Sequence, residues 1–126
     1  MSDTTALINQ IRARERYFAY SIPLTVIPAL ATVPVSLLIG AEAFEVYIIT
    51  GLTAFPLTLN ISFREQGGED WNNLPIQWNN MVGTALQPFW LPITRLIEPR
   101  KTLTITLTDI GAGNVTTLTL HGGKIL

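Results

Sequence analysis

The chain has 126 residues, which suits one domain that buries roughly two-thirds of its unfolded surface. Charged residues make up only 13% of it, about half the share in an ordinary domain, and apolar residues make up 48%. The net charge of −1 argues against a nucleic-acid-binding protein, and the absence of cysteine excludes disulfides, thiol catalysis and thiolate zinc sites. So few charges favour either an assembly subunit or a neutral, threonine-rich β surface.

The N-terminal segment differs from the remainder and is predicted to form a separate arm or short helix (1–16), ahead of a β domain (17–126). Because it is too short to be stable as an isolated helix, it is expected either to contact a neighbour or to remain a frayed terminus. Arg12, Arg14 and Arg16 recur at every second position, so in an extended arm they project to one side. Such a run could contact an acidic protein surface or a nucleic-acid backbone. Because three basic charges are few and Glu15 lies among them, a protein partner is favoured.

An uncharged stretch, residues 21–40, has the length of a membrane-spanning helix. Pro23, Pro28 and Pro34 interrupt it, and each removes a helical hydrogen-bond donor and clashes with the preceding turn. The flanks also lack an aromatic belt with a basic asymmetry. The stretch is therefore predicted to form two strands joined by a turn, and no membrane partner is expected.

From residue 17 onward the apolar residues follow a period of two, which is typical of strands. Residues 17–27 are predicted to form a strand that is interrupted near Pro23, and such a strand lies at a sheet edge or contains a bulge. Residues 29–39 and 44–53 are predicted to form the second and third strands. Phe44, Val46 and Ile48 are expected to share one face of the third strand.

Two segments alternate most regularly between apolar and polar side chains, as strands with one buried face do. In residues 57–63 the side chains predicted to be buried are Leu57, Leu59, Ile61 and Phe63. In residues 103–107 they are Leu103, Ile105 and Leu107. A flexible turn (109–114) follows, and residues 115–122 are predicted to return as the hairpin partner of 103–107.

The region between these segments, residues 64–101, is irregular and contains the tryptophans. A short strand bounded by prolines is predicted over 88–92, with Phe89 and Trp90 on opposite faces, and another over 95–97. The chain then has about eight short strands with turn signals roughly every ten residues. This spacing predicts an all-β, single-domain, two-sheet β-sandwich of the jelly-roll type.

Chemically reactive side chains do not form a recognisable catalytic pattern, so the protein is not expected to be an enzyme. His121, the single histidine, belongs to the polar face of the last predicted strand. The most closely spaced carboxylates are Glu65, Glu69 and Asp70. Their glycine-containing loop matches no calcium-binding signature and is interpreted as a solvated turn. No catalytic residue, metal site or cofactor is therefore expected.

The tryptophans suggest a contact surface, because aromatic residues contribute much of the energy of protein interfaces. Trp71 and Trp78 lie in polar surroundings and are predicted either to contact a partner or to anchor their loop by packing. Together with Arg12, Arg14 and Arg16 they make up the candidate interface.

Several short motifs resemble a known family. They are Phe44-Glu45-Val46-Tyr47-Ile48, Pro88-Phe89-Trp90-Leu91-Pro92 with Arg95 just after, Leu103-Thr104-Ile105-Thr106-Leu107, and the ending Leu118-Thr119-Leu120-His121-Gly122-Gly123-Lys124. Over residues 17–126 this order is similar to the small β-sandwich virion proteins encoded in structural gene clusters of tailed bacteriophages. Those proteins typically carry a Pro-Phe-x-Leu-Pro segment and end near Leu-x-Leu-His-Gly-x-Lys. The arm before residue 17 lies outside the resemblance.

The resemblance implies a non-enzymatic virion component, foremost a capsid decoration (cement) protein that assembles in the host cytoplasm. Its expected partners are the major capsid protein and copies of itself, often as a trimer, with no small-molecule substrate and no nucleic acid. No functional residues carry over, because the family pattern contains no catalytic positions. A neck or tail component is the nearest alternative. A third is a carbohydrate-binding jelly roll that uses Trp71, Trp78 and Trp90.

Overall fold

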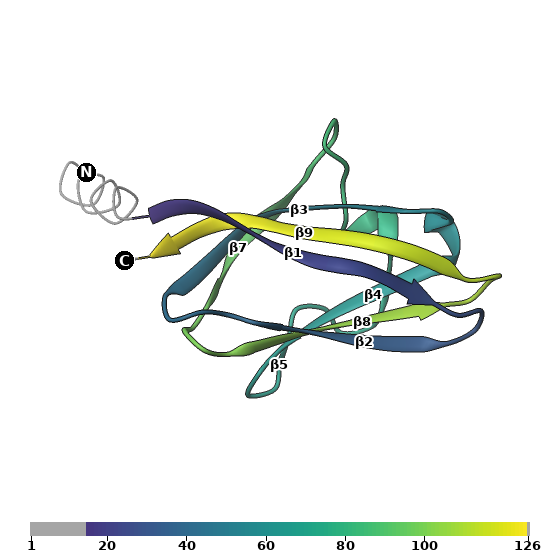
Figure 1. Cartoon of the computed structure of the whole chain (residues 1–126), viewed down its shortest axis with the longest axis horizontal. Helices are drawn as coiled ribbons and strands as arrows, with labels where there is room; N and C mark the ends of the chain where they lie inside the picture. Colours follow the sequence, from purple (N-terminus) through teal and green to yellow (C-terminus); the bar gives the residue numbers. More distant parts are fainter. Residues whose placement is uncertain (1–14, 126) are drawn as a thin grey trace.

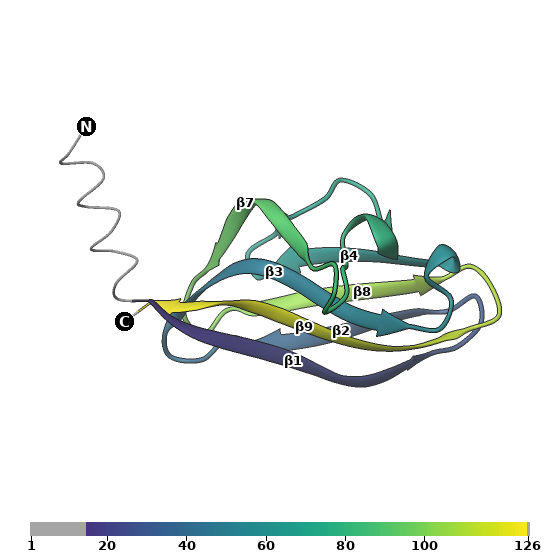
Figure 2. The same cartoon turned by 90° about the horizontal axis from the view of Figure 1, so that it is seen from above.

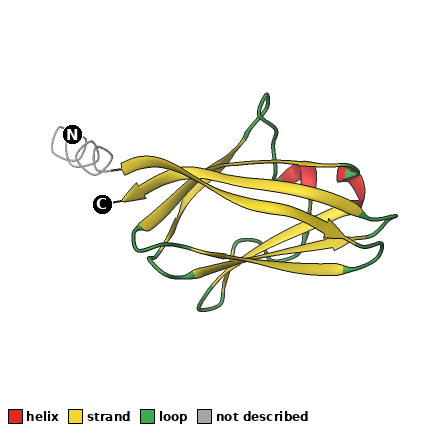
Figure 3. Ribbon diagram, viewed as in Figure 1, coloured by secondary structure: helices red, strands yellow, loops and turns green. Residues whose placement is uncertain are grey.

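The computed structural model describes residues 15–125, which form a sandwich of two antiparallel sheets (Figures 1 and 3). The first sheet has the order β1-β9-β3-β7, made of β1 (Glu15–Ile27), β9 (Asn114–Ile125), β3 (Ala43–Thr53) and β7 (Phe89–Ile97). The second has the order β2-β8-β4-β5, made of β2 (Thr32–Leu38), β8 (Thr102–Asp109), β4 (Leu59–Glu65) and β5 (Glu69–Asp70). Outside this order lie β6 (Ile76–Gln77), which pairs with β4, and the 3₁₀ helices η1 (Pro56–Thr58) and η2 (Trp78–Asn80). The predicted all-β sandwich is confirmed.

The strand order is that of a jelly roll. The pairs β1·β9, β2·β8, β3·β7 and β4·β5 are those of one long antiparallel ribbon folded back on itself near β4 and β5. Rolling this ribbon brings β3 beside β9 and β4 beside β8, which completes the two sheets (Figure 2). Most consecutive strands therefore lie in opposite sheets.

The two regularly alternating segments form the centre of the core. In β8, Leu103, Ile105 and Leu107 are buried between the sheets, as predicted. In β4 the alternation also holds from Leu59 onward. The prediction for Leu57 is wrong, because Pro56 begins the η1 helix and Leu57 projects into solvent instead.

A bulge in β3 reverses the predicted alternation. The pairing of β3 with both neighbours shifts register between Val46 and Ile48, which leaves Tyr47 as the extra residue. Beyond the bulge Ile49 is the buried residue, and Ile48 is only partly buried. The expectation that Ile48 shares one face with Phe44 and Val46 is therefore wrong.

The predicted C-terminal hairpin does not form. Strand β8 pairs with β2 and β4, whereas β9 pairs with β1 and β3, so residues 109–114 cross from one sheet to the other. The turn residues are compatible with a hairpin, but the long ribbon pairs β8 with β2 and β9 with β1, which lie in opposite sheets. The predicted edge position of residues 17–27 is confirmed, since β1 is an outer strand with a register shift between Ile22 and Thr25.

Two further predictions concern strand boundaries. Residues 88–92 and 95–97, predicted as separate strands, belong to the single strand β7. Its residues Phe89 and Trp90 do lie on opposite faces, since Phe89 packs against the core and Trp90 is exposed. The uncharged residues 21–40 lie mainly in β1 and β2. Over residues 15–125, no helix is both long and apolar enough to cross a membrane.

Candidate functional site

Charged side chains are distributed unevenly along the sandwich. Strand β1 begins and β9 ends at one end of its long axis, and the β1–β2, β3–β4 and β8–β9 connections lie at the other (Figures 1 and 2). The charged residues in the half nearer the first end are Arg16, Glu42, Glu45, Arg64, Glu65, Asp70, Arg95, Glu98, Arg100, Lys101 and Lys124. In residues 16–125 the opposite half contains one charged residue, Asp109, which is 1% exposed. The half in which β1 begins and β9 ends is named the charged end, and the opposite half is named the apolar end.

The apolar end consists of the loops at residues 28–31, 54–58 and 110–113 with the strand ends that flank them. Its large apolar side chains, each between 42% and 78% exposed, are Leu24, Val26, Leu30, Leu52, Phe55, Leu57, Ile110 and Val115. Single exposed apolar residues are ordinary on a monomer, but a cluster of them with no exposed charge marks an interaction surface. The apolar end is therefore the first candidate site.

Asn114, buried beneath the surface, hydrogen-bonds to the 54–58 loop and to Asp109, which precedes the 110–113 loop. It is 4% exposed, and its Oδ1 accepts hydrogen bonds from Thr53 Oγ1 and the Phe55 amide, both at 2.7 Å. Its Nδ2 donates to the Phe55 carbonyl oxygen at 3.3 Å and to Asp109 Oδ2 at 2.6 Å. The side-chain amide thus satisfies backbone groups of the β3–β4 loop that the ladder of strand hydrogen bonds does not reach.

Asp109 organises the β8–β9 loop in the same way. Its Oδ1 accepts hydrogen bonds from the amides of Gly111 at 2.8 Å and Gly113 at 3.1 Å. Burial alone would raise the pKa of this carboxyl group, but the hydrogen bonds from Asn114, Gly111, Gly113 and the Leu30 backbone hold the pKa below its usual value. The carboxylate is therefore ionised at neutral pH, and its charge is satisfied inside the loop.

Backbone hydrogen bonds complete the connection between the loops. The Asp109 amide donates to the Ala31 carbonyl oxygen, and the Ile110 amide donates to the Thr58 carbonyl oxygen, both at 2.9 Å. The β8–β9 loop is thus bonded to the loop on either side. The exposed apolar side chains stand on a preorganised surface, which loses less conformational entropy on docking than a flexible loop would.

Leu30 at the tip of this end has an unusual backbone conformation. It is the third residue of a β-turn closed by a hydrogen bond from the Ala31 amide to the Pro28 carbonyl oxygen, and its φ is +58°. Glycine or asparagine is favoured there, because the left-handed region costs other residues about 1–2 kcal/mol. Leu30 is 78% exposed, so packing within the chain does not offset this cost. Strain retained at an exposed apolar residue is typical of a functional surface.

The second candidate site is an aromatic groove on the outer face of the β1-β9-β3-β7 sheet. Its volume is about 350 Å³, and it is lined by Tyr17, Tyr47, Ile48, Trp90, His121, Gly122 and Gly123. All four strands contribute to it, because Ile48 pairs with both His121 and Trp90 across the sheet. The bulge at Tyr47 is what aligns Ile48 with these two partners.

His121 is held rigidly in this groove. Its Nδ1 lies 2.8 Å from the Tyr17 hydroxyl, and its Nε2 lies 2.8 Å from Thr50 Oγ1. The Tyr17 and His121 rings are stacked with their centroids 6.2 Å apart. The polar face predicted for His121 is therefore the face that carries the groove. The groove itself was not predicted, because its residues come from strands far apart in the sequence.

The predicted interface tryptophans are buried. Trp71 stacks on Phe63 with ring centroids 4.8 Å apart, donates from Nε1 to Glu65 Oε2 at 2.8 Å, and lies under the Arg95 guanidinium. Trp78 is 3% exposed. Of the two roles predicted for these side chains, partner contact and loop anchoring, their burial fits the loop anchor, because stacking and burial stabilise an otherwise irregular segment.

The predicted arginine run lies largely outside the described residues. This applies to Arg12 and Arg14, together with residues 1–14 of the predicted arm. Arg16 lies in β1 at the charged end and is exposed. It does not share a surface with Trp71 or Trp78, which are buried.

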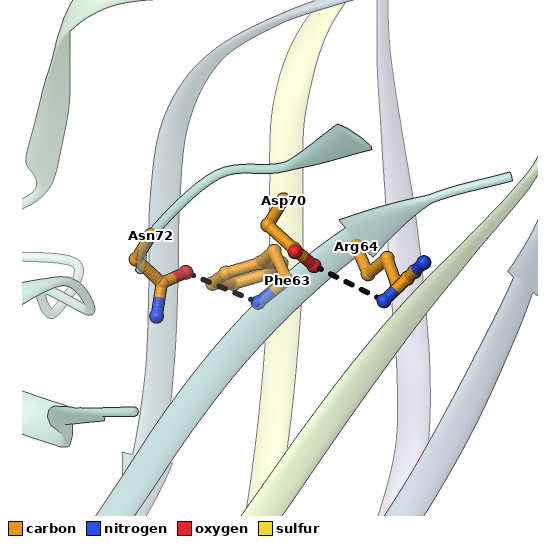
Figure 4. Close-up of polar contacts among 4 residues, drawn as sticks. All are labelled: Phe63, Arg64, Asp70 and Asn72. Atoms are coloured by element: carbon orange, nitrogen blue, oxygen red, sulfur yellow. Dashed lines mark hydrogen bonds and ion pairs between the residues drawn. The ribbon is translucent and has the colours of Figure 1, made fainter. Parts of the chain in front are cut away.

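The carboxylate-containing loop between β4 and β5 is held by surface contacts (Figure 4). Arg64 Nη1 and Asp70 Oδ1 form an exposed ion pair at 3.8 Å. The Phe63 amide donates to Asn72 Oδ1 at 3.3 Å, which positions the segment that follows β5. Throughout the described part of the chain, no three His, Cys, Asp or Glu residues are grouped so that they could hold a metal ion.

No protein-family model and no curated protein matches the sequence. Among solved structures, the chain is similar to the exo-β-1,3-galactanase of Phanerochaete chrysosporium, determined with galactose, at 10% identity and a TM-score of 0.39. It is also similar to the VP2 subviral particle of infectious bursal disease virus, at 11% identity and a TM-score of 0.32. These alignments cover 84% and 88% of this chain but only 29% and 42% of the other chains.

Proposed function

We propose that this protein is a non-enzymatic virion subunit, a capsid decoration (cement) protein of a tailed phage that docks its apolar end on the major capsid protein. The observation that carries the proposal is the apolar end, where eight large apolar side chains are exposed around loops without an exposed charge. A monomer would leave this surface in water, whereas a subunit of an assembly buries it. The assignment to a tailed phage is supported only by the resemblance of the short sequence motifs.

The preorganisation of the apolar end supports docking on a rigid partner. Two buried polar side chains, Asp109 and Asn114, hydrogen-bond to the loops, so the surface exists before any partner arrives. The charged end then faces outward, where its solvated side chains maintain solubility. Further copies of this chain are also expected partners in the assembly. A neck or tail component would dock through the same apolar end but be present in fewer copies.

The first test is the number of copies in purified particles of the phage that encodes the chain, read from a stained gel against the major capsid protein. The decoration proposal predicts hundreds of copies and a loss of heat stability in particles that lack the protein. A stoichiometry near six or twelve copies instead assigns the chain to the neck or tail. Absence from the particles contradicts the virion proposal altogether.

A pair of matched variants tests which end docks. Leu57 at the apolar end and Leu38 at the charged end are similarly exposed, at 68% and 65%. Leu57→Glu should lower particle occupancy about tenfold or more, because docking would bury an unpaired carboxylate. Leu38→Glu should leave occupancy unchanged, and both variants should fold, since neither side chain is in the core. Equal loss in both variants would contradict docking through the apolar end.

A further inference from the structure

We infer that the aromatic groove on the β1-β9-β3-β7 sheet is a binding site for a neutral saccharide. This site is separate from the apolar end, and no residue belongs to both surfaces. The inference therefore does not depend on the proposed virion role. The exposed rings, the absence of Asp, Glu, Lys and Arg from the lining, and the fixed polar atoms of the groove all suit an uncharged sugar.

Two aromatic rings of the groove are largely exposed to solvent. Tyr17 on β1 is 74% exposed and Trp90 on β7 is 64% exposed, on opposite outer strands of the same sheet. Gly122 and Gly123 on β9, between those strands, contribute no side chains to the lining. The carbon-bound hydrogens on one face of a pyranose ring pack well on such rings, which present an apolar body with a polar edge. The arrangement suits a flat ligand that enters an open groove.

The charge of the lining matches an uncharged ligand. No Asp, Glu, Lys or Arg side chain lines the groove. A charged ligand would lose hydration there without gaining an opposite charge, which is unfavourable. A polyhydroxyl ligand loses far less, because each hydroxyl can exchange water for a protein hydrogen bond.

The polar atoms are few and fixed, as ligand sites generally require. Both ring nitrogens of His121 have hydroxyl partners, the Tyr17 hydroxyl and Thr50 Oγ1, each at 2.8 Å. A hydroxyl group has one donor and two acceptor positions, so Tyr17 and Thr50 can each bond a ligand hydroxyl while holding the imidazole. These groups would set the orientation of a sugar whose flat face rests on Trp90.

A second hollow extends the groove along the sheet. It measures about 260 Å³ and is lined by Ile48, Thr50, Ala85, Pro88 and His121, so it shares Ile48 and His121 with the first. The two together form one trough whose lining contains no Asp, Glu, Lys or Arg. A trough of this kind suits an oligosaccharide of more than one residue better than a single sugar.

The experiment uses the full chain on an array of neutral oligosaccharides, built from hexoses and N-acetylhexosamines, with their sialylated counterparts. Neutral glycans should bind, and adding a sialic acid to the bound end should weaken binding. Titration of the best neutral glycan should perturb tryptophan fluorescence, because Trp90 is exposed whereas Trp71 and Trp78 are buried. The inference is overturned if no neutral glycan binds at millimolar concentration.

Variants locate the site and separate it from docking. Trp90→Ala and Tyr17→Ala should each weaken glycan binding about tenfold, the loss expected for one stacking contact. Phe55→Ala, which removes an exposed aromatic ring at the apolar end, should leave glycan binding unchanged. Glycan binding that survives both groove substitutions overturns the inference. Trp90→Ala should not change particle occupancy, so loss of occupancy without loss of glycan binding would assign the groove to a protein partner.

Discussion

The two ends of the sandwich are held together in opposite ways. At the charged end, the Arg64–Asp70 ion pair joins two side chains that are 61% and 53% exposed. At the apolar end, Asp109 and Asn114 are almost fully buried and bond to backbone groups of the loops. A solvated ion pair contributes little to the free energy of unfolding, whereas leaving a buried polar group without its hydrogen-bond partner lowers that free energy substantially. The polar residues that stabilise the loops of the apolar end are therefore buried beneath its exposed apolar side chains.

Removing the Asn114 side chain should have the largest effect on stability. Asn114→Ala removes the side-chain hydrogen bonds to the buried Asp109 carboxylate and to the Phe55 amide, and should lower the free energy of unfolding by about 2–3 kcal/mol. The matched change at the charged end, Asp70→Ala, should cost no more than about 0.5–1 kcal/mol. Urea denaturation followed by fluorescence measures both. Similar losses at the two ends would contradict the difference described above.

The charge on Asp109 should make the stability of the apolar end depend on pH. Because the pKa of Asp109 in the folded protein is lowered from its ordinary value of 3.8, the ionised carboxylate stabilises the fold above that ordinary value. This contribution should be lost as the pH falls through the lowered pKa. Asp109→Asn should be less stable than the natural chain at pH 7, and the gap should narrow below about pH 4. Denaturation curves between pH 2 and pH 7 test this, and a constant gap would contradict it.

The smallest expected effect concerns two strained turns, one at each end. Leu30 and Arg100 have φ values of +58° and +62°, each as the third residue of a β-turn. Leu30→Gly and Arg100→Gly should each raise the free energy of unfolding by up to about 1 kcal/mol, because glycine adopts this conformation without steric strain. Only Leu30→Gly should lower particle occupancy. If neither variant gains stability, the strain assigned to these turns is absent.

The sequence predicted strands more reliably than their partners. The alternation in β4 and β8 identified the buried faces correctly, because a strand with one buried and one solvent-exposed face places an apolar residue at every second position. The bulge at Tyr47 was not predicted, because one extra residue reverses the alternation and no residue type in the sequence marks its position. The hairpin was predicted from a glycine-rich turn that is equally compatible with a crossing between sheets.

The candidate sites were mostly not predictable. The uncharged stretches that form the apolar end were visible, but their meeting at one end depends on the path of the chain. Asp109 followed by Gly111 and Gly113 was the one local signal, because an aspartate often accepts a hydrogen bond from the amide two residues later. The polar sequence neighbours of Trp71 and Trp78 left partner contact and loop anchoring equally open, and only the tertiary structure shows that both rings are buried.

By itself the sequence determined the fold class, the low charge and the alternating faces of the central strands, because these follow from composition and from the two-residue repeat of a strand. Tertiary structure decided which loops meet, which aromatic rings face water and which polar groups are buried. These properties depend on rolling the ribbon, which joins residues that are distant in the chain. The apolar end and the aromatic groove both arise at that level.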